Sequence, residues 1–192
     1  MRYHHFWPLN DIYFGVGAAG IIEEVSLITN DRNYLFVNLN RYSLLDALNF
    51  FSRTSDINKI IVIISSSRLM PLACFWLTEC KNVIAVFDAT TSVQDIIRNV
   101  SQHQSGENEK MLTEQRDYRF RINRKDIVKM KYFLSESGME ELQDRFMNSP
   151  STMYRWRKEL AVKFGVREPR YLLLPDSVTL QKCVILLSKN TG

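Results

Sequence analysis

The sequence predicts an α/β module with a mainly parallel sheet, followed by an all-helical domain. Strand-like and helix-like segments alternate through the first hundred residues, which is the pattern of an α/β fold. The run Lys59–Ser65 is continuously apolar and β-branched after its lysine, as in a central strand buried on both faces of a parallel sheet. A polar, glycine-containing stretch then separates this module from segments that have only helical spacing.

These observations divide the chain into four parts. They are an α/β domain over residues 1–101, a linker over 102–118, a helical domain over 119–178 and a tail over 179–192.

Hydrophobic spacing and turn residues place the elements of the α/β domain. Strands are expected at residues 2–7, 34–38, 59–65 and 83–87, with a further possible strand at 25–29. Helices are expected at residues 11–24, 43–53, 69–80 and 92–101. The predicted helix at 11–24 contains Gly15, Gly17 and Gly20 in the spacing G-x-G-x-x-G. In a dinucleotide site such glycines form a tight turn against pyrophosphate, so a small nucleotide-dependent enzyme is one alternative. Close packing of a helix on the sheet is the other explanation of these glycines.

Charge is distributed unevenly along the chain. Residues 1–100 hold 8 basic and 9 acidic residues, whereas residues 101–192 hold 17 basic and 12 acidic residues. The excess of positive charge therefore lies in the second half, where it indicates a polyanionic partner. The three cysteines (Cys74, Cys80 and Cys183) have no metal-binding spacing, so we expect no metal and no cofactor. No signal peptide and no run approaching 18 apolar residues is evident, so we expect a cytoplasmic protein without a membrane span.

The helical domain centres on a segment that begins at Ser149-Pro150 and ends at Gly165. A serine hydroxyl caps a helix, proline suits the first helical position, and glycine commonly ends one. At about 100° per residue, one face is apolar: Met153, Trp156, Leu160, Ala161 and Phe164. The opposite face carries Ser151, Tyr154, Arg155, Lys158 and Val162.

Further helices are expected at residues 124–136, 139–147 and 168–174. The helix at 139–147, a short turn and the helix that follows Ser149 form a helix-turn-helix, whose second helix carries donors and cations for a DNA major groove. The alternative is a helix whose basic face is simply exposed to solvent and binds no DNA.

Residues 124–174 resemble the four-helix DNA-binding domain of LuxR/FixJ-type regulators. The matching residues are Ser149-x-x-Thr152-Met153-x-x-Trp156 and Lys163-Phe164-Gly165-Val166. Trp156 stands where the family usually has histidine, and the turn near Gly138 is altered. The resemblance implies contacts with double-stranded DNA by Ser151, Thr152, Tyr154, Arg155, Lys158 and Lys163, with Lys163 at the phosphate backbone.

Residues 1–100 resemble a shortened receiver domain of response regulators. The positions of a receiver's acidic pair, phosphorylated aspartate and lysine hold Trp7-Pro8, Asn38 and Asp88 instead. Because an amide cannot be phosphorylated like a carboxylate, we expect no phosphotransfer here.

The chain from Met1 to about Leu180 resembles RcsA-like auxiliary regulators, most distinctively at residues 5–14 and 154–160. This resemblance implies transcriptional control of capsular polysaccharide genes, and of motility and secretion genes, together with an RcsB-like response regulator. A homodimer is the other possible partnership, with docking expected on the helices at 69–80 and 92–101. A protein-interaction co-regulator with little DNA binding of its own is the remaining alternative.

Overall fold

The chain forms two compact units in the computed structural model, which describes residues 5–29, 33–40, 44–53, 58–103, 111–112, 121–135, 138, 140, 141, 144, 149–164 and 168–173. The first, the α/β unit, comprises residues 1–40 and 53–118. The second, the helical unit, comprises residues 41–52 and 119–192. The helical unit thus includes a segment from the first half of the chain, whereas the sequence placed that segment in the α/β domain.

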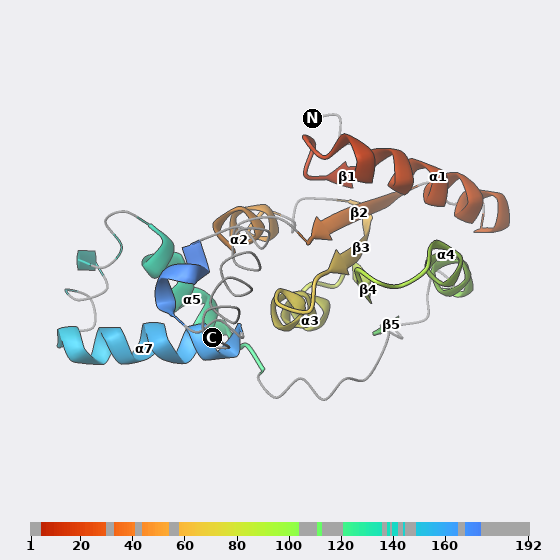
Figure 1. Ribbon diagram of the computed structural model, residues 1–192. Coiled ribbons are helices and arrows are strands. Elements are labelled where there is room, and N and C mark those ends of the chain that lie inside the picture. Colours follow the sequence, from red (N-terminus) through yellow and green to blue (C-terminus); the bar gives the residue numbers. More distant parts are fainter. Residues whose placement is uncertain are drawn as a thin grey trace, which may run out of the picture. The chain divides into compact units, whose positions relative to one another are not determined.

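The α/β unit is built on a five-stranded parallel sheet with the order β1-β2-β3-β4-β5 (Figure 1). Its strands are β1 (Phe6–Trp7), β2 (Tyr34–Leu39), β3 (Ile60–Ser65), β4 (Val83–Asp88) and β5 (Met111–Leu112). Phe36 in β2 pairs with Phe6 on one side and Val62 on the other. The parallel α/β character predicted from alternating segments is therefore confirmed.

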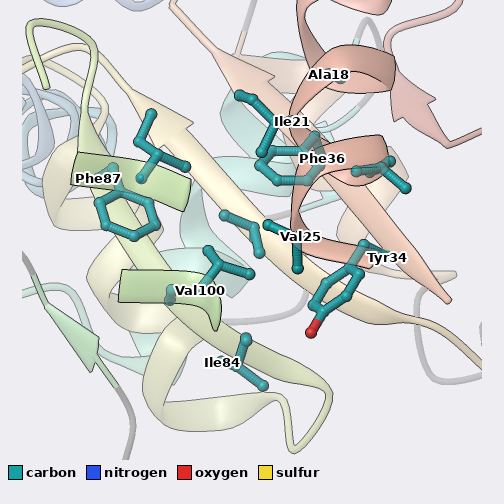
Figure 2. Packing of buried hydrophobic residues seen from close by; sticks show 12 residues of the cluster. Ala18, Ile21, Val25, Tyr34, Phe36, Ile84, Phe87 and Val100 are labelled. Carbon is teal, nitrogen blue, oxygen red and sulfur yellow. The ribbon is translucent and has the colours of Figure 1, made fainter. Parts of the chain in front are cut away.

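Helices cover both faces of this sheet (Figure 1). On one face α1 (Ile12–Thr29) contacts α4 (Val93–Gln102), while on the other α3 (Met70–Glu79) packs on β3 and β4. Figure 2 shows side chains of α1, α4 and the central strands meeting in one apolar core. Every residue of β2 is buried, because a strand between two helical layers has no solvent-facing side. The labelled members of the core are Ala18, Ile21, Val25, Tyr34, Phe36, Ile84, Phe87 and Val100.

The possible strand at residues 25–29 is instead the last part of α1. Two hydroxyl groups bond within the helix: Ser26 Oγ donates to the Glu23 carbonyl at 2.8 Å, and Thr29 Oγ1 donates to the Val25 carbonyl at 3.0 Å. Val25 is fully buried on the sheet. Burial of Val25 in phase with the earlier apolar positions of α1 therefore outweighs the strand preference of these residues.

The strand order differs from that of receiver domains, which is 2-1-3-4-5. Here β1 lies at the edge, beside β2 only, and the following strands succeed one another across the sheet. The chain therefore never reverses direction across the sheet, and the receiver resemblance does not extend to strand order. A ligand crevice of the kind found where strand order reverses is not formed by this order.

Helix α1 is rich in apolar residues, and its charged residues are Glu23 and Glu24. It has 18 residues and a mean hydropathy of 1.4, with a third of the segment buried, so by length and composition it could cross a membrane. Glu23 and Glu24 interrupt the apolar run of α1, so the expectation of no run approaching 18 apolar residues is not contradicted by this hydropathy criterion. Core helices meet it as well, since a helix packed on a sheet is also rich in apolar residues.

The helical unit contains α2 (Leu44–Phe51), α5 (Arg124–Leu134), α7 (Pro150–Lys163) and the 3₁₀ helix η2 (Pro169–Leu173). Helix α2 contacts α5 and η2, and α7 contacts the same two elements. The predicted helix at 139–147 lies mostly outside the described residues; residues 140, 141 and 144 are helical. The predicted tail at 179–192, most of the linker and Gly165 also lie outside them.

Candidate nucleic-acid interface

Helix α7 begins at a serine cap and a proline, as the sequence predicts. The Ser149 hydroxyl accepts the Thr152 backbone N–H at 3.3 Å and lies 2.8 Å from the Ser151 hydroxyl. Pro150 occupies the first turn, where its missing N–H leaves no hydrogen bond unmade. Ser151 and Thr152, both predicted DNA contacts, therefore stand in the first turn of the helix, where backbone N–H groups and the helix dipole favour phosphate.

Helix α7 has one buried and one exposed face. Met153, Leu160, Ala161 and Phe164 are all at most 1% exposed, which confirms these positions of the predicted apolar face. Ser151, Tyr154, Arg155, Lys158 and Val162 are all exposed. We call these five residues the outer face of α7. It brings together a hydroxyl, a phenol, a guanidinium and an ammonium, which are donors suited to base edges and phosphates.

Trp156 and Arg157 are turned toward α5 and lie outside this face. The Lys129 Nζ is 4.1 Å from the centroid of the Trp156 ring, and the Arg157 guanidinium carbon is 5.7 Å from that of Phe133. Such cation–π contacts hold α7 against α5. Arg157 thus belongs to the packing of the unit, as its half-turn offset from Arg155 would have indicated.

Lys163 has a different place from the other predicted contacts. Its ammonium forms an ion pair with Asp126 of α5, whose side chain is 9% exposed against 23% for Lys163. Asp126 also belongs to a capping box, in which Asn123 accepts the Asp126 N–H and Asp126 accepts the Asn123 N–H, both at 3.0 Å. Lys163 therefore joins the start of α5 to the end of α7, while its contact with DNA stays a prediction.

Sequence reasoning missed the structural role of Asn123 and Asp126. The capping box could have been recognised from the sequence, because a cap residue followed by an acid three positions later marks the start of a helix. The pairing of Asp126 with Lys163 could not be predicted, since the two residues are 37 positions apart in the sequence.

Among the residues that the structure describes, Arg155 on the outer face forms an exposed ion pair with Glu159. Its Nε lies 3.8 Å from the Glu159 carboxylate, and the two side chains are 70% and 57% exposed. Exposed pairs of this kind contribute at most about 1 kcal/mol. The guanidinium can therefore exchange Glu159 for a phosphate or a guanine at little cost.

Asn38, which the sequence resemblance aligned with a receiver's phosphorylated aspartate, lies near the carboxyl end of β2. Its Nδ2 donates to Asp11 Oδ2 at 2.9 Å, and its Oδ1 accepts the Asn40 N–H at 2.9 Å. Asp11 in turn accepts the Phe14 N–H at 3.0 Å. The Asn38 amide thus fixes the start of α1 to the end of β2.

Phosphodonors are accordingly expected to leave the protein unchanged. After incubation with acetyl phosphate, intact-mass spectrometry should show no phosphoryl adduct, because Asn38 offers no carboxylate. A response regulator whose receiver keeps its aspartate, treated in parallel, serves as the positive control. A stable acyl phosphate on residues 1–100 would contradict this expectation.

The glycines at positions 15, 17 and 20 all lie inside α1 and form no turn. A Cβ at Gly15 would approach the Phe6 ring to 2.5 Å, so this glycine lets α1 lie close to β1. The dinucleotide interpretation is therefore wrong, because its phosphate-binding turn does not exist here. Close packing accounts for Gly15 but not for Gly17 or Gly20, which have nothing within 4 Å of a built Cβ.

The comparisons with known proteins indicate that the chain is a regulatory protein. The family model of the EcpR N-terminal domain matches residues 2–104, and the chain belongs to this family. The chain is a regulatory protein and not an enzyme. It is 94% identical over 180 residues to the Vi polysaccharide biosynthesis protein TviA of Salmonella typhi, across 94% of this chain and 99% of that protein. No solved structure matches the chain.

Proposed function

We propose that this protein is a DNA-binding transcriptional regulator of Vi capsular polysaccharide genes, and that the outer face of α7 enters the major groove. The observation that carries the proposal is the exposure of Tyr154, Arg155 and Lys158 on a helix whose other face is buried. The name of the similar protein supplies the capsule genes as targets. Motility and secretion genes are further expected targets.

The two sides of α7 carry side chains with different roles, which supports this proposal. Long donors face outward, whereas the aromatic and cationic side chains at 156 and 157 hold the helix on α5. The positive charge of the second half of the chain adds attraction to phosphates at any sequence. Tyr154, at 59% exposure, supplies an amphipathic side chain beside these cations.

A single recognition helix covers only a few base pairs, so specific binding needs a second one. We propose that an RcsB-like response regulator supplies it in a complex with this chain. A receiver-like switch within the chain itself is not available, because Asn38 replaces the aspartate.

Removing either outer cation should weaken DNA binding. Arg155→Ala and Lys158→Ala are each expected to cost about 1–3 kcal/mol in affinity for a promoter fragment of the Vi capsule genes, measured by gel shift. Arg98→Ala and Lys81→Ala are the matched controls, because each removes one exposed cation from the α/β unit. Both controls should bind the fragment as the unaltered protein does.

The same assay, repeated with the response regulator added, separates this proposal from a co-regulator without DNA contacts of its own. We expect the partner to raise affinity and the Arg155 and Lys158 variants to remain weaker in its presence. Equal affinity of all four variants, with and without the partner, would rule out the contact by α7.

A further inference from the structure

Helix α5 carries two lysines on one side. Lys125 and Lys129 are four residues apart, so their side chains are neighbours on the surface of α5. Lys125 is exposed and Lys129 is half-buried. Helix α5 contacts α7 (Figure 1), and the Lys129 ammonium lies 4.1 Å from the centroid of the Trp156 ring. The ring of Trp156 thus holds the Lys129 ammonium against α7.

Trp156 stands at one flank of the outer face of α7. It lies roughly 100° around the helix from Arg155, and Thr152 precedes it by one turn on the same flank. A helix with its side chains is about 10–12 Å wide, and the major groove of DNA is about 12 Å wide. A helix that enters the groove therefore fills it, and the phosphates of the two strands border its flanks. The Lys129 ammonium stands at such a flank.

The acids of α5 and α7 are engaged by other groups. Each helix contains one acid, Asp126 in α5 and Glu159 in α7. The Asp126 carboxylate is paired with a lysine at the end of α7, and that of Glu159 lies beside a guanidinium of its own helix. In the part of the chain that the structure describes, no carboxylate forms an ion pair with Lys125 or Lys129. Both ammonium groups are therefore available to an anion.

The positions of the two lysines are electrostatically unfavourable within the protein alone. Lys125 lies in the first turn of α5, where the helix dipole disfavours a cation. Two like charges four residues apart on a helix also repel each other. A row of phosphates offsets both effects, whereas a neutral or cationic surface offsets neither. The charge of this surface therefore favours a polyanion beside α7.

We infer that Lys125 and Lys129 contact the phosphate backbone of the DNA whose major groove α7 enters. The inference rests on the proposed function, because it requires the outer face of α7 to lie in that groove. An ammonium has three N–H donors, so the contact of Lys129 with Trp156 leaves donors for a phosphate oxygen. Contacts of this kind fix the orientation of α7 on the duplex and read no bases.

The salt dependence of DNA binding by the full-length protein tests these contacts. Lys125→Gln and Lys129→Gln should each reduce the slope of log affinity against log salt by about 1. Each should weaken binding roughly tenfold at about 0.1 M salt, because one phosphate contact contributes a slope of about 0.9. The loss should be equal on a Vi capsule promoter fragment and on an unrelated fragment of the same length, since phosphates carry no sequence information. Lys129→Arg keeps the charge and should retain the slope of the unaltered protein.

Lys131→Gln is the matched control, because Lys131 is an exposed lysine on the opposite side of α5 from Lys129. It should leave both slope and affinity unchanged. Hydrogen exchange on peptides of α5 and α7 checks that each variant keeps the helical unit folded. A loss of slope in Lys131→Gln equal to that in Lys129→Gln would overturn the inference, because it would indicate general charge attraction and no specific contact.

The double variant Arg155→Ala/Lys158→Ala separates this inference from the proposed function. If this variant loses affinity while Lys125→Gln and Lys129→Gln bind as the unaltered protein does, α7 binds DNA without phosphate contacts from α5. The inference would then be wrong and the proposed function would stand. Unchanged slope and affinity in the double variant and in both glutamine variants would contradict the two together.

Discussion

Leu44→Ala is expected to lower the free energy of unfolding of the helical unit by about 2–5 kcal/mol. Leu44 belongs to α2 and is fully buried. It lines a small gap with Met130 and Phe133 of α5 and Leu172 of η2. A residue from the first half of the chain thus completes the core of the helical unit, and truncating it leaves a cavity among these side chains.

Leu45→Ala is the matched control, because Leu45 is the next residue and is 37% exposed. Leu45→Ala should lower the free energy of unfolding far less, since truncating a partly exposed side chain leaves little buried space. Hydrogen exchange measured on peptides of α5 and α7 reports the helical unit separately from the sheet. Equal protection in the two variants would show that α2 is not part of the core of this unit. A fragment starting at residue 119 should show weak protection for the same reason.

Asp126→Ala is expected to cost about 2–4 kcal/mol of stability. The change removes the capping box at the start of α5 and leaves the half-buried Lys163 ammonium without its carboxylate. Breaking a buried pair costs more than the pair contributes, because the remaining charge stays poorly solvated. Hydrogen exchange of α5 and α7 again gives the measurement.

Two further variants separate the causes of this loss. Glu159→Ala removes an acid from the exposed pair with Arg155 and should change stability by less than about 1 kcal/mol. Adding Lys163→Met to Asp126→Ala should recover part of the loss, because it removes the unpaired charge. If Asp126→Ala lowered the free energy of unfolding no more than Glu159→Ala does, the buried ion pair would make no measurable contribution to stability.

Much of the α/β unit could be predicted because its signals are local. The continuous apolar runs at β2 and β3 indicate strands covered on both sides, and the structure buries nearly all of their residues. The end of α1 was mistaken for a strand because Val25–Thr29 is rich in residues that favour strands. The deciding factor was the helical phase of Val25 with Ile21 and Ile22, which bury on the same face.

The partner of α2 could not be predicted from the sequence. Leu44, Leu48 and Phe51 indicate that one face of the helix is buried, but they do not specify what covers it. The same limit applies to the strand order, which depends on how far each crossover carries the chain. Contacts between segments distant in the sequence determine both the partner of α2 and the order of the strands.

The outer face of α7 could be predicted, since helical spacing alone separates it from the buried residues. Lys163 shows where spacing fails: it is a cation near the predicted interface, but its partner Asp126 comes from another helix. The exposure of Leu27 and Ile28 at the end of α1 was not predicted, because the sequence interpretation ended this helix at residue 24.

The salt dependence of DNA binding tests the central claim most directly. Affinity of the full-length protein for a Vi capsule promoter fragment is measured at several salt concentrations, beside the double variants Arg155→Ala/Lys158→Ala and Lys81→Ala/Arg98→Ala. If Arg155 and Lys158 meet phosphates, the slope of log affinity against log salt should shrink by about 2 in the first double variant only. Equal slopes in all three proteins, with equal affinities, would contradict the placement of α7 on DNA.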